Sequence, residues 1–145
     1  MKIGNLLKDP KLCVLSEQST VREAAKQMAD NDFAAIVVTD DDGKLLGIVT
    51  ERDMTRRIII KDLDANTVTV GEIMTRNPDT LAPGDSALNA LELMRTRKYR
   101  HLPKVDDGRV VGMVSIRDLY AAVKTALEED IRKTGAFVLG DRYGT

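Results

Sequence analysis

The sequence has few of the residues on which metal centres, disulfides and aromatic platforms depend. Cys13 is the only cysteine and His101 the only histidine among the 145 residues. A single cysteine excludes an intrachain disulfide, and these two residues together cannot supply a zinc centre. Aromatic residues make up 3% of the chain and tryptophan is absent, which argues against the base-stacking surfaces of single-strand-binding proteins.

Long apolar runs and an excess of one charge are also missing. No apolar stretch approaches the length of about 18 residues that a membrane-spanning helix needs, and the N-terminus lacks the apolar core of a signal peptide. We therefore expect a cytoplasmic protein with no membrane partner. The net charge of −1 argues against nucleic acid as a partner. With 43% hydrophobic and 31% charged residues, the chain has the composition of a globular protein.

Sets of catalytic residues are equally scarce. One histidine and one cysteine do not assemble into a Ser/His/Asp or Cys/His set. No P-loop and no glycine-rich dinucleotide motif is present. The acidic run at residues 40–42 lacks the spacing of a calcium loop and is expected to be a solvated turn. We predict a protein that is not an enzyme and carries no cofactor or metal.

What the sequence does contain is an internal repeat. Gly47 to Asp53 reads GIVTERD, and Gly112 to Asp118, 65 positions later, reads GMVSIRD. Upstream of these segments the match continues with one residue more between the copies. The extra residue falls in the acidic turn before Gly43, where insertions are tolerated.

Each copy predicts the element order β-α-β-β-α. Ser19-Thr20 and Asp85-Ser86 are N-cap residues, and Glu23 completes a capping box with Thr20. The apolar residues that follow recur with the helical period, at Val21, Ala24, Ala25 and Met28 and at Ala87, Ala90, Leu91 and Met94. Asp-Gly turns between β-branched runs predict a hairpin in each copy.

We expect strands over residues 12–15, 35–39 and 45–49 in the first copy and over 79–81, 102–105 and 110–114 in the second. Closing helices are expected over 51–61 and 116–133. Residues 3–7 and 70–74 match each other and predict a short lead-in helix for each copy.

One copy, of about 60 residues, buries too little surface to be stable alone. The fold class we expect is therefore α/β (α+β), with two repeats packed through their sheets in pseudo-two-fold symmetry around a shared core. The predicted domains are residues 1–65 and 66–127. Residues 128–145 form a helix end and a tail to which we assign no role.

The repeated pattern of glycine, two hydrophobic residues, Thr or Ser, any residue, Arg and Asp resembles the signature of cystathionine-β-synthase (CBS) domains, which occur in pairs. Ile73-Met74-Thr75 and the YRHLP sequence at 99–103 are also typical of that family, and the resemblance covers about residues 1–125. It implies a non-catalytic regulatory module with an adenosine-type ligand between the copies. It also implies a homodimer and a regulated protein that we cannot identify. AMP, ADP or ATP is the favoured ligand, and S-adenosylmethionine or NAD is the alternative.

The pairs Thr50–Asp53 and Ser115–Asp118 have two interpretations. A hydroxyl and an acid three residues apart at a helix start resemble a capping box. The same geometry offers amides and a hydroxyl to a phosphate, and a carboxylate to both hydroxyls of a ribose. Capping does not explain the repeated glycine and arginine, and these residues, together with the resemblance to CBS domains above all, favour ligand binding.

Arg100 and His101 precede the middle strand of the second copy, close to the helix start at Ser115. Similar positions in CBS pairs carry residues that meet phosphates; the alternative is a solvated basic face with Arg97 and Lys98. Because the first copy has Ala34-Ala35 there, we expect unequal sites, with the second-copy site the stronger anion binder. The residues expected at the nucleotide are Thr50, Arg52, Asp53, Thr80, Arg100, His101, Ser115, Arg117 and Asp118.

The two closing helices also carry apolar residues that either fill the core or form a dimer seam, and we favour the dimer. They are Ile58, Ile59, Ile60, Leu119, Tyr120, Val123 and Leu127. A ligand-free structural dimerisation module is the alternative to a sensor.

Overall fold

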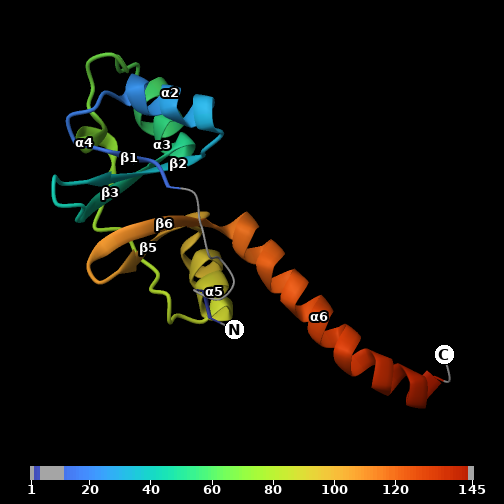
Figure 1. Ribbon diagram of the computed structural model, residues 1–145. Coiled ribbons are helices and arrows are strands. Elements are labelled where there is room, and N and C mark those ends of the chain that lie inside the picture. Colours follow the sequence, from blue (N-terminus) through green and yellow to red (C-terminus); the bar gives the residue numbers. More distant parts are fainter. Residues whose placement is uncertain (1, 4–11, 144–145) are drawn as a thin grey trace.

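The computed structural model describes residues 2–3 and 12–143, which form two α/β units stacked through their sheets (Figure 1). The first unit contains β1 (Val14–Leu15), α2 (Val21–Asn31), β2 (Ala35–Thr39), β3 (Leu45–Thr50), α3 (Glu51–Met54) and the π-helix η1 (Thr55–Ile59). A linker with α4 (Val70–Ile73) and β4 (Thr75–Arg76) leads to the second unit. That unit contains α5 (Ala87–Arg97), β5 (His101–Asp106), β6 (Arg109–Ser115) and α6 (Ile116–Tyr143). The predicted fold class and repeat are confirmed.

The first sheet has four strands and the second has two. β1 pairs parallel with β2, β2 antiparallel with β3, and β3 antiparallel with the linker strand β4. β5 and β6 form an antiparallel hairpin. The strand predicted over 79–81 is wrong, because Leu81 makes only an isolated parallel bridge to Lys104. Pro83 follows two residues later and cannot donate to a ladder.

The predicted caps of the first helix in each copy are present. The Glu23 amide donates to Thr20 Oγ1 at 3.1 Å and the Thr20 amide donates to Glu23 Oε2 at 3.2 Å, which completes the capping box. In the second copy the cap is Ser86, which accepts from the Asn89 amide at 3.3 Å. The buried helix positions follow the predicted period except for Ala25, which is exposed and makes the apolar face narrower than expected.

The closing helices differ most from the prediction. The first is not a continuous α-helix, because α3 passes directly into the π-helical turn η1. The second continues ten residues beyond the predicted end at 133, to Tyr143. Gly135 costs about 1 kcal/mol of helix propensity but does not end the helix. Figure 1 shows α6 projecting away from the rest of the molecule.

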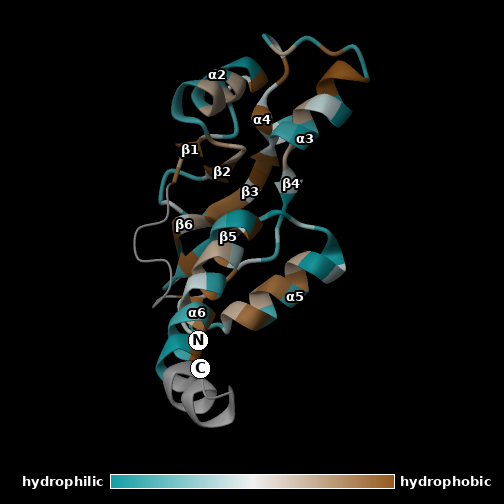
Figure 2. Ribbon diagram, turned by 90° about the vertical axis from the view of Figure 1, so that its right-hand side faces the viewer, coloured by the Kyte–Doolittle hydropathy of each residue, from teal (hydrophilic) through white to brown (hydrophobic). Residues whose placement is uncertain are grey.

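Three clusters of buried side chains form the interior. One lies within each unit, and a third joins the two sheets through Ala35, Val37, Ile48 and Met113. This third cluster confirms packing through the sheets, although the interior is divided rather than one shared core. Figure 2 shows the hydrophobic character of β3, which lies at the centre of this arrangement.

The lead-in segments are exchanged between the two copies. Val70, Ile73 and Met74, which the predicted boundary assigns to the second domain, pack in the cluster of the first unit. Ile3 is fully buried in the cluster of the second unit, and its amide donates to the Asp85 carbonyl at 3.0 Å. Residues 4–7 of the first predicted lead-in helix lie outside the described residues.

Within the described part of the chain, no helix combines the length and the apolar character that crossing a bilayer requires.

Candidate functional site

A pocket of about 630 Å³ opens between the two copies. Its walls come from the junction of β3 and α3, from the linker after β4, and from the turn between α5 and β5. The lining includes residues 50–53, 75, 78–79 and 97–102. The volume lies within the range of small-molecule sites, which is roughly 300–1,000 Å³.

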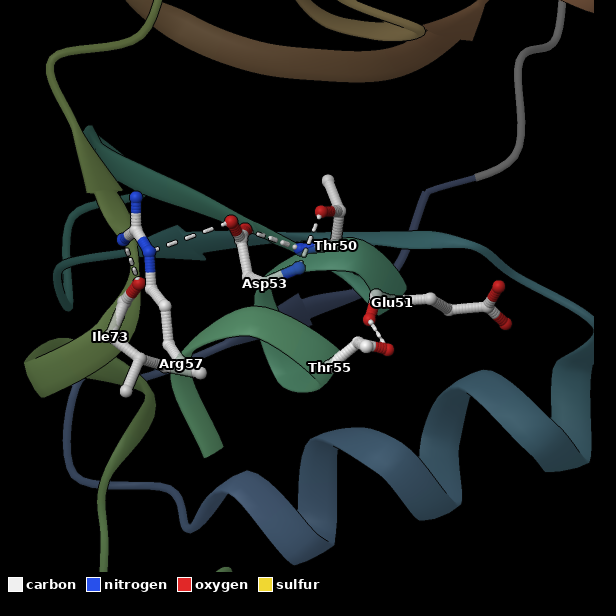
Figure 3. A network of polar contacts seen from close by, with 6 residues as sticks. All are labelled: Thr50, Glu51, Asp53, Thr55, Arg57 and Ile73. Atoms are coloured by element: carbon white, nitrogen blue, oxygen red, sulfur yellow. Dashed lines mark hydrogen bonds and ion pairs between the residues drawn. The ribbon is translucent and has the colours of Figure 1, made fainter. Parts of the chain in front are cut away.

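At the first-copy wall, Thr50 and Asp53 form a capping box (Figure 3). The Asp53 amide donates to Thr50 Oγ1 at 3.2 Å, and the Thr50 amide donates to Asp53 Oδ2 at 2.9 Å. The capping interpretation is therefore confirmed at this helix start. Both side chains can still bind a ligand, because the Thr50 hydroxyl can donate its proton and both Asp53 carboxylate oxygens have further lone pairs.

Arg57 contacts the same carboxylate from the following turn. Its Nε lies 3.8 Å from Asp53 Oδ1, and its Nη1 donates to the Ile73 carbonyl oxygen in the linker. Figure 3 shows the guanidinium between these two groups. The Asp53 side chain is 17% exposed, so it is held within the pocket wall rather than free in solvent.

Cationic side chains outnumber carboxylates along the pocket. Arg52, Arg56, Arg97, Lys98 and Arg100 lie there with Glu51, Asp53 and Asp79. Two of the three acids also have an arginine partner, since Arg57 pairs with Asp53 and Arg97 with Asp79, the latter at 3.2 Å. The pocket therefore carries net positive charge and favours an anionic ligand.

His101 connects this pocket to the second helix start. It lines the pocket and lies opposite Ser115 in the β5–β6 ladder. Burial lowers the pKa of His101, while Asp118 raises it in part and Arg100 lowers it further. The imidazole is therefore neutral at pH 7 and offers one N–H donor.

The predicted site residues divide into two groups. Thr50, Arg52, Asp53, Arg100 and His101 line the one pocket. Ser115, Arg117 and Asp118 lie at the start of α6, where the Asp118 amide donates to Ser115 Oγ at 2.9 Å, and Thr80 is exposed. None of these last four residues lines the pocket that the described residues form.

Arg100 and His101 were expected to serve the helix start of their own copy. In the structure His101 does lie opposite Ser115 and the Arg100 carbonyl accepts from the Ile116 amide at 2.7 Å, but both residues also line the pocket that contains the helix start of the other copy. The basic residues and the Thr50–Asp53 pair are thus combined across the interface between the repeats.

Sequence reasoning missed Arg56, Asp79 and Arg57. It assigned Arg97 and Lys98 only to the alternative of a solvated face, whereas both line the pocket. The signal that could have revealed Arg57 is a difference between the copies, because the matching position 65 residues later is Ala122.

The family model for the CBS domain matches residues 3–60 and again residues 70–125. The chain belongs to the CBS-domain family. Each match covers one repeat of the sequence together with its lead-in segment, so the chain contains a CBS pair.

Among curated relatives, the CBS domain-containing protein CBSX3, mitochondrial, of Arabidopsis thaliana is 35% identical over 125 residues. The match covers 83% of this chain and 61% of that protein. The chain therefore spans less than two thirds of this relative.

Two solved structures of CBS proteins carry adenosine compounds. The CBS domain protein PAE2072 from Pyrobaculum aerophilum, complexed with AMP, has a TM-score of 0.74 and 33% identity over 81% of this chain and 89% of its own. The CBS domain pair of MJ0100, in complex with 5′-methylthioadenosine and S-adenosyl-L-methionine, has a TM-score of 0.73 and 28% identity over 83% of this chain and 98% of its own.

Proposed function

We propose that this CBS pair is a non-catalytic regulatory module that binds AMP, ADP or ATP in the pocket between the copies. The observation that supports this most is the combination of the Thr50–Asp53 pair with five cationic side chains around one space. Every nucleotide contains a sugar linked to a phosphate. The pocket contains a carboxylate that suits the sugar and cations that suit the phosphate.

Each part of a nucleotide has a matching part of the wall. The Asp53 carboxylate can accept hydrogen bonds from the ribose hydroxyls, and Arg100 can hold a phosphate through its planar donor fork. The base can lie against Ile48, which lines the pocket and is 6% exposed. A neutral His101 adds one further N–H toward the phosphate.

The charge of the lining supports a phosphate-bearing ligand over S-adenosylmethionine. S-adenosylmethionine carries a sulfonium, an ammonium and a carboxylate, so its net charge is positive and a net positive pocket disfavours it. AMP, ADP and ATP carry at least one phosphate and gain from the same field. This charge balance is why we favour a nucleotide over the sulfonium compound.

Isothermal titration calorimetry on the folded protein with AMP, ATP, S-adenosylmethionine and NAD tests the proposal. We expect AMP and ATP to bind more tightly than S-adenosylmethionine, with affinities that fall as salt rises. Arg100→Gln should weaken both nucleotides. The control Arg22→Gln changes an exposed arginine of α2, outside the lining, and should not. Absence of heat with all four ligands would reject a sensor.

One observation favours a second candidate, a structural module that functions without a ligand. Thr50 and Asp53 already satisfy each other's backbone amides at 3.2 and 2.9 Å, so the helix start needs no ligand to be stable. Under that function Arg100→Gln and Asp53→Asn would leave every property of the chain except local stability unchanged.

A regulatory output requires a second conformational state and a partner that recognises it. For this role we propose a homodimer that presents the module to a regulated protein. The exposed apolar residues of the closing helices support the dimer. Ile59, Ile60, Tyr120 and Leu127 are 66%, 72%, 64% and 47% exposed, whereas Ile58, Leu119 and Val123 are buried in the core.

A further inference from the structure

We infer that Arg57 is a positioning residue for sugar recognition: it orients the Asp53 carboxylate so that the pocket distinguishes ribose from 2′-deoxyribose. The inference rests on the proposed function, since it concerns how the same pocket recognises the sugar of its nucleotide. Arg57 itself need not touch the ligand.

The guanidinium of Arg57 has a partner on each side. Nη1 donates to the carbonyl oxygen of Ile73, a residue that is 4% exposed, and Nε lies 3.8 Å from Asp53 Oδ1. A guanidinium is a rigid plane with its donors in fixed directions. Because Nη1 donates to this carbonyl, the guanidinium is directed along the linker and its Nε lies beside Asp53 (Figure 3).

Each oxygen of the Asp53 carboxylate has a neighbour in the wall, a hydrogen-bond donor at one and a cation at the other. Oδ2 accepts from the Thr50 amide at 2.9 Å, and Oδ1 faces Arg57. Each oxygen keeps a further lone pair for a hydroxyl. A carboxylate that is oriented in this way is a preorganised acceptor for two neighbouring hydroxyls. A sugar that lacks one of them leaves a lone pair without its partner, which is costly in a partly buried site.

The local backbone carries Arg57 in an uncommon conformation. It lies in η1, where the Ile60 amide donates to the Thr55 carbonyl at 3.1 Å, five residues back. Such π turns are rare and occur frequently at functional sites. In this chain the π turn is the segment that bridges the pocket acid and the linker.

The second copy has no equivalent of this arrangement. Position 122, which corresponds to Arg57 in the repeat, is alanine and cannot pair with Asp118. Sugar selection through a carboxylate paired with an arginine is therefore a property of the helix start in the first copy. The substitution Arg57→Ala gives the first copy the residue that the second copy has at this position.

The experiment compares AMP with 2′-deoxy-AMP by calorimetry on the full chain. We expect the unchanged protein to prefer AMP by at least about tenfold. In Arg57→Ala the AMP affinity should fall by about tenfold while the deoxy compound is little affected, so that the ratio approaches one. Arg57→Lys keeps a charge but cannot hold both partners, and should give an intermediate ratio.

Arg56→Ala is the matched control, because Arg56 lines the pocket and makes no ion pair with Asp53 among the described residues. It should weaken both nucleotides equally and preserve the ratio. Retention of the ratio of the unchanged protein in Arg57→Ala, or an equal loss for both ligands together with a lower melting temperature, would overturn the positioning role alone. If the unchanged protein binds neither nucleotide, the proposed function falls and the inference falls with it.

Discussion

Gly47 on β3 lies directly against Met74 of the linker. A Cβ atom on Gly47 would lie 2.6 Å from the Met74 sulfur and 2.7 Å from the Thr75 carbonyl oxygen. The Met74 side chain is 5% exposed and packed in the first cluster, and the carbonyl belongs to the strand paired with β3. Neither neighbour can move aside without disturbing the sheet, so this position requires glycine.

Gly47→Ala should therefore lower the free energy of unfolding by about 1–3 kcal/mol, the usual cost of overpacking. Urea titration followed by circular dichroism measures it. The control is Gly84→Ala, where no atom lies within 4 Å of the added Cβ and the change should stay within about 0.5 kcal/mol. Equal changes in the two variants would contradict the contact.

Asp53→Asn should reduce AMP affinity about tenfold or more, because a neutral amide replaces the charged acceptor for the ribose hydroxyls. Asp118→Asn should reduce it less, since Asp118 does not line the pocket that the described residues form. This order reverses the expectation from the sequence that the second-copy site is the stronger. Calorimetry of both variants checks it, and a larger loss for Asp118→Asn would restore the earlier expectation.

His101 should make the folded state less stable in mild acid. Burial lowers its pKa below the ordinary value of 6.5, so the unfolded chain binds a proton at a higher pH than the folded one. The free energy of unfolding should therefore decrease as the pH drops below about 6.5. The contribution of His101 to this decrease should end once the pH is below the lowered pKa of the folded state. Thermal melts between pH 7.5 and 5 measure the slope. His101→Gln cannot titrate and should flatten it; an unchanged slope would assign the effect to other groups.

Ile60→Lys should convert the proposed homodimer to a monomer, because it places a charge on a side chain that is 72% exposed and belongs to the expected seam. Sedimentation velocity measures the change. Leu88→Lys makes the same substitution at a 58% exposed residue of α5 and should leave the mass unchanged. If the dimer persists in Ile60→Lys but dissociates in Leu88→Lys, the dimer interface lies on α5 instead.

The order of helices and strands was predictable because it depends on local chemistry. Thr20 and Glu23 lie close together in sequence and form their cap whatever the rest of the chain does. The turn residues and the helical period act at similarly short range. The internal repeat then made the element order of the second copy predictable from that of the first.

Contacts between the copies were not predictable in the same way. The predicted hairpin brings Arg100 near Ser115 of the same copy but does not show that Arg100 lines one pocket with Thr50 of the other copy. The repeated glycine was attributed to a ligand, whereas at Gly47 the crossing linker explains it. The π turn at Thr55–Ile59 has no composition that distinguishes it from an α-helix.

The exchanged lead-in segments have a consequence during synthesis. When residue 65 has left the ribosome, the hydrophobic cluster of the first unit still lacks Val70, Ile73 and Met74. Ile3 packs in the cluster of the second unit, whose last member in the sequence is Val123. Nascent chains that end before Met74 should therefore expose the apolar surface of the first unit to chaperones and proteases, and the second unit should acquire protection only after Val123 of α6 has emerged.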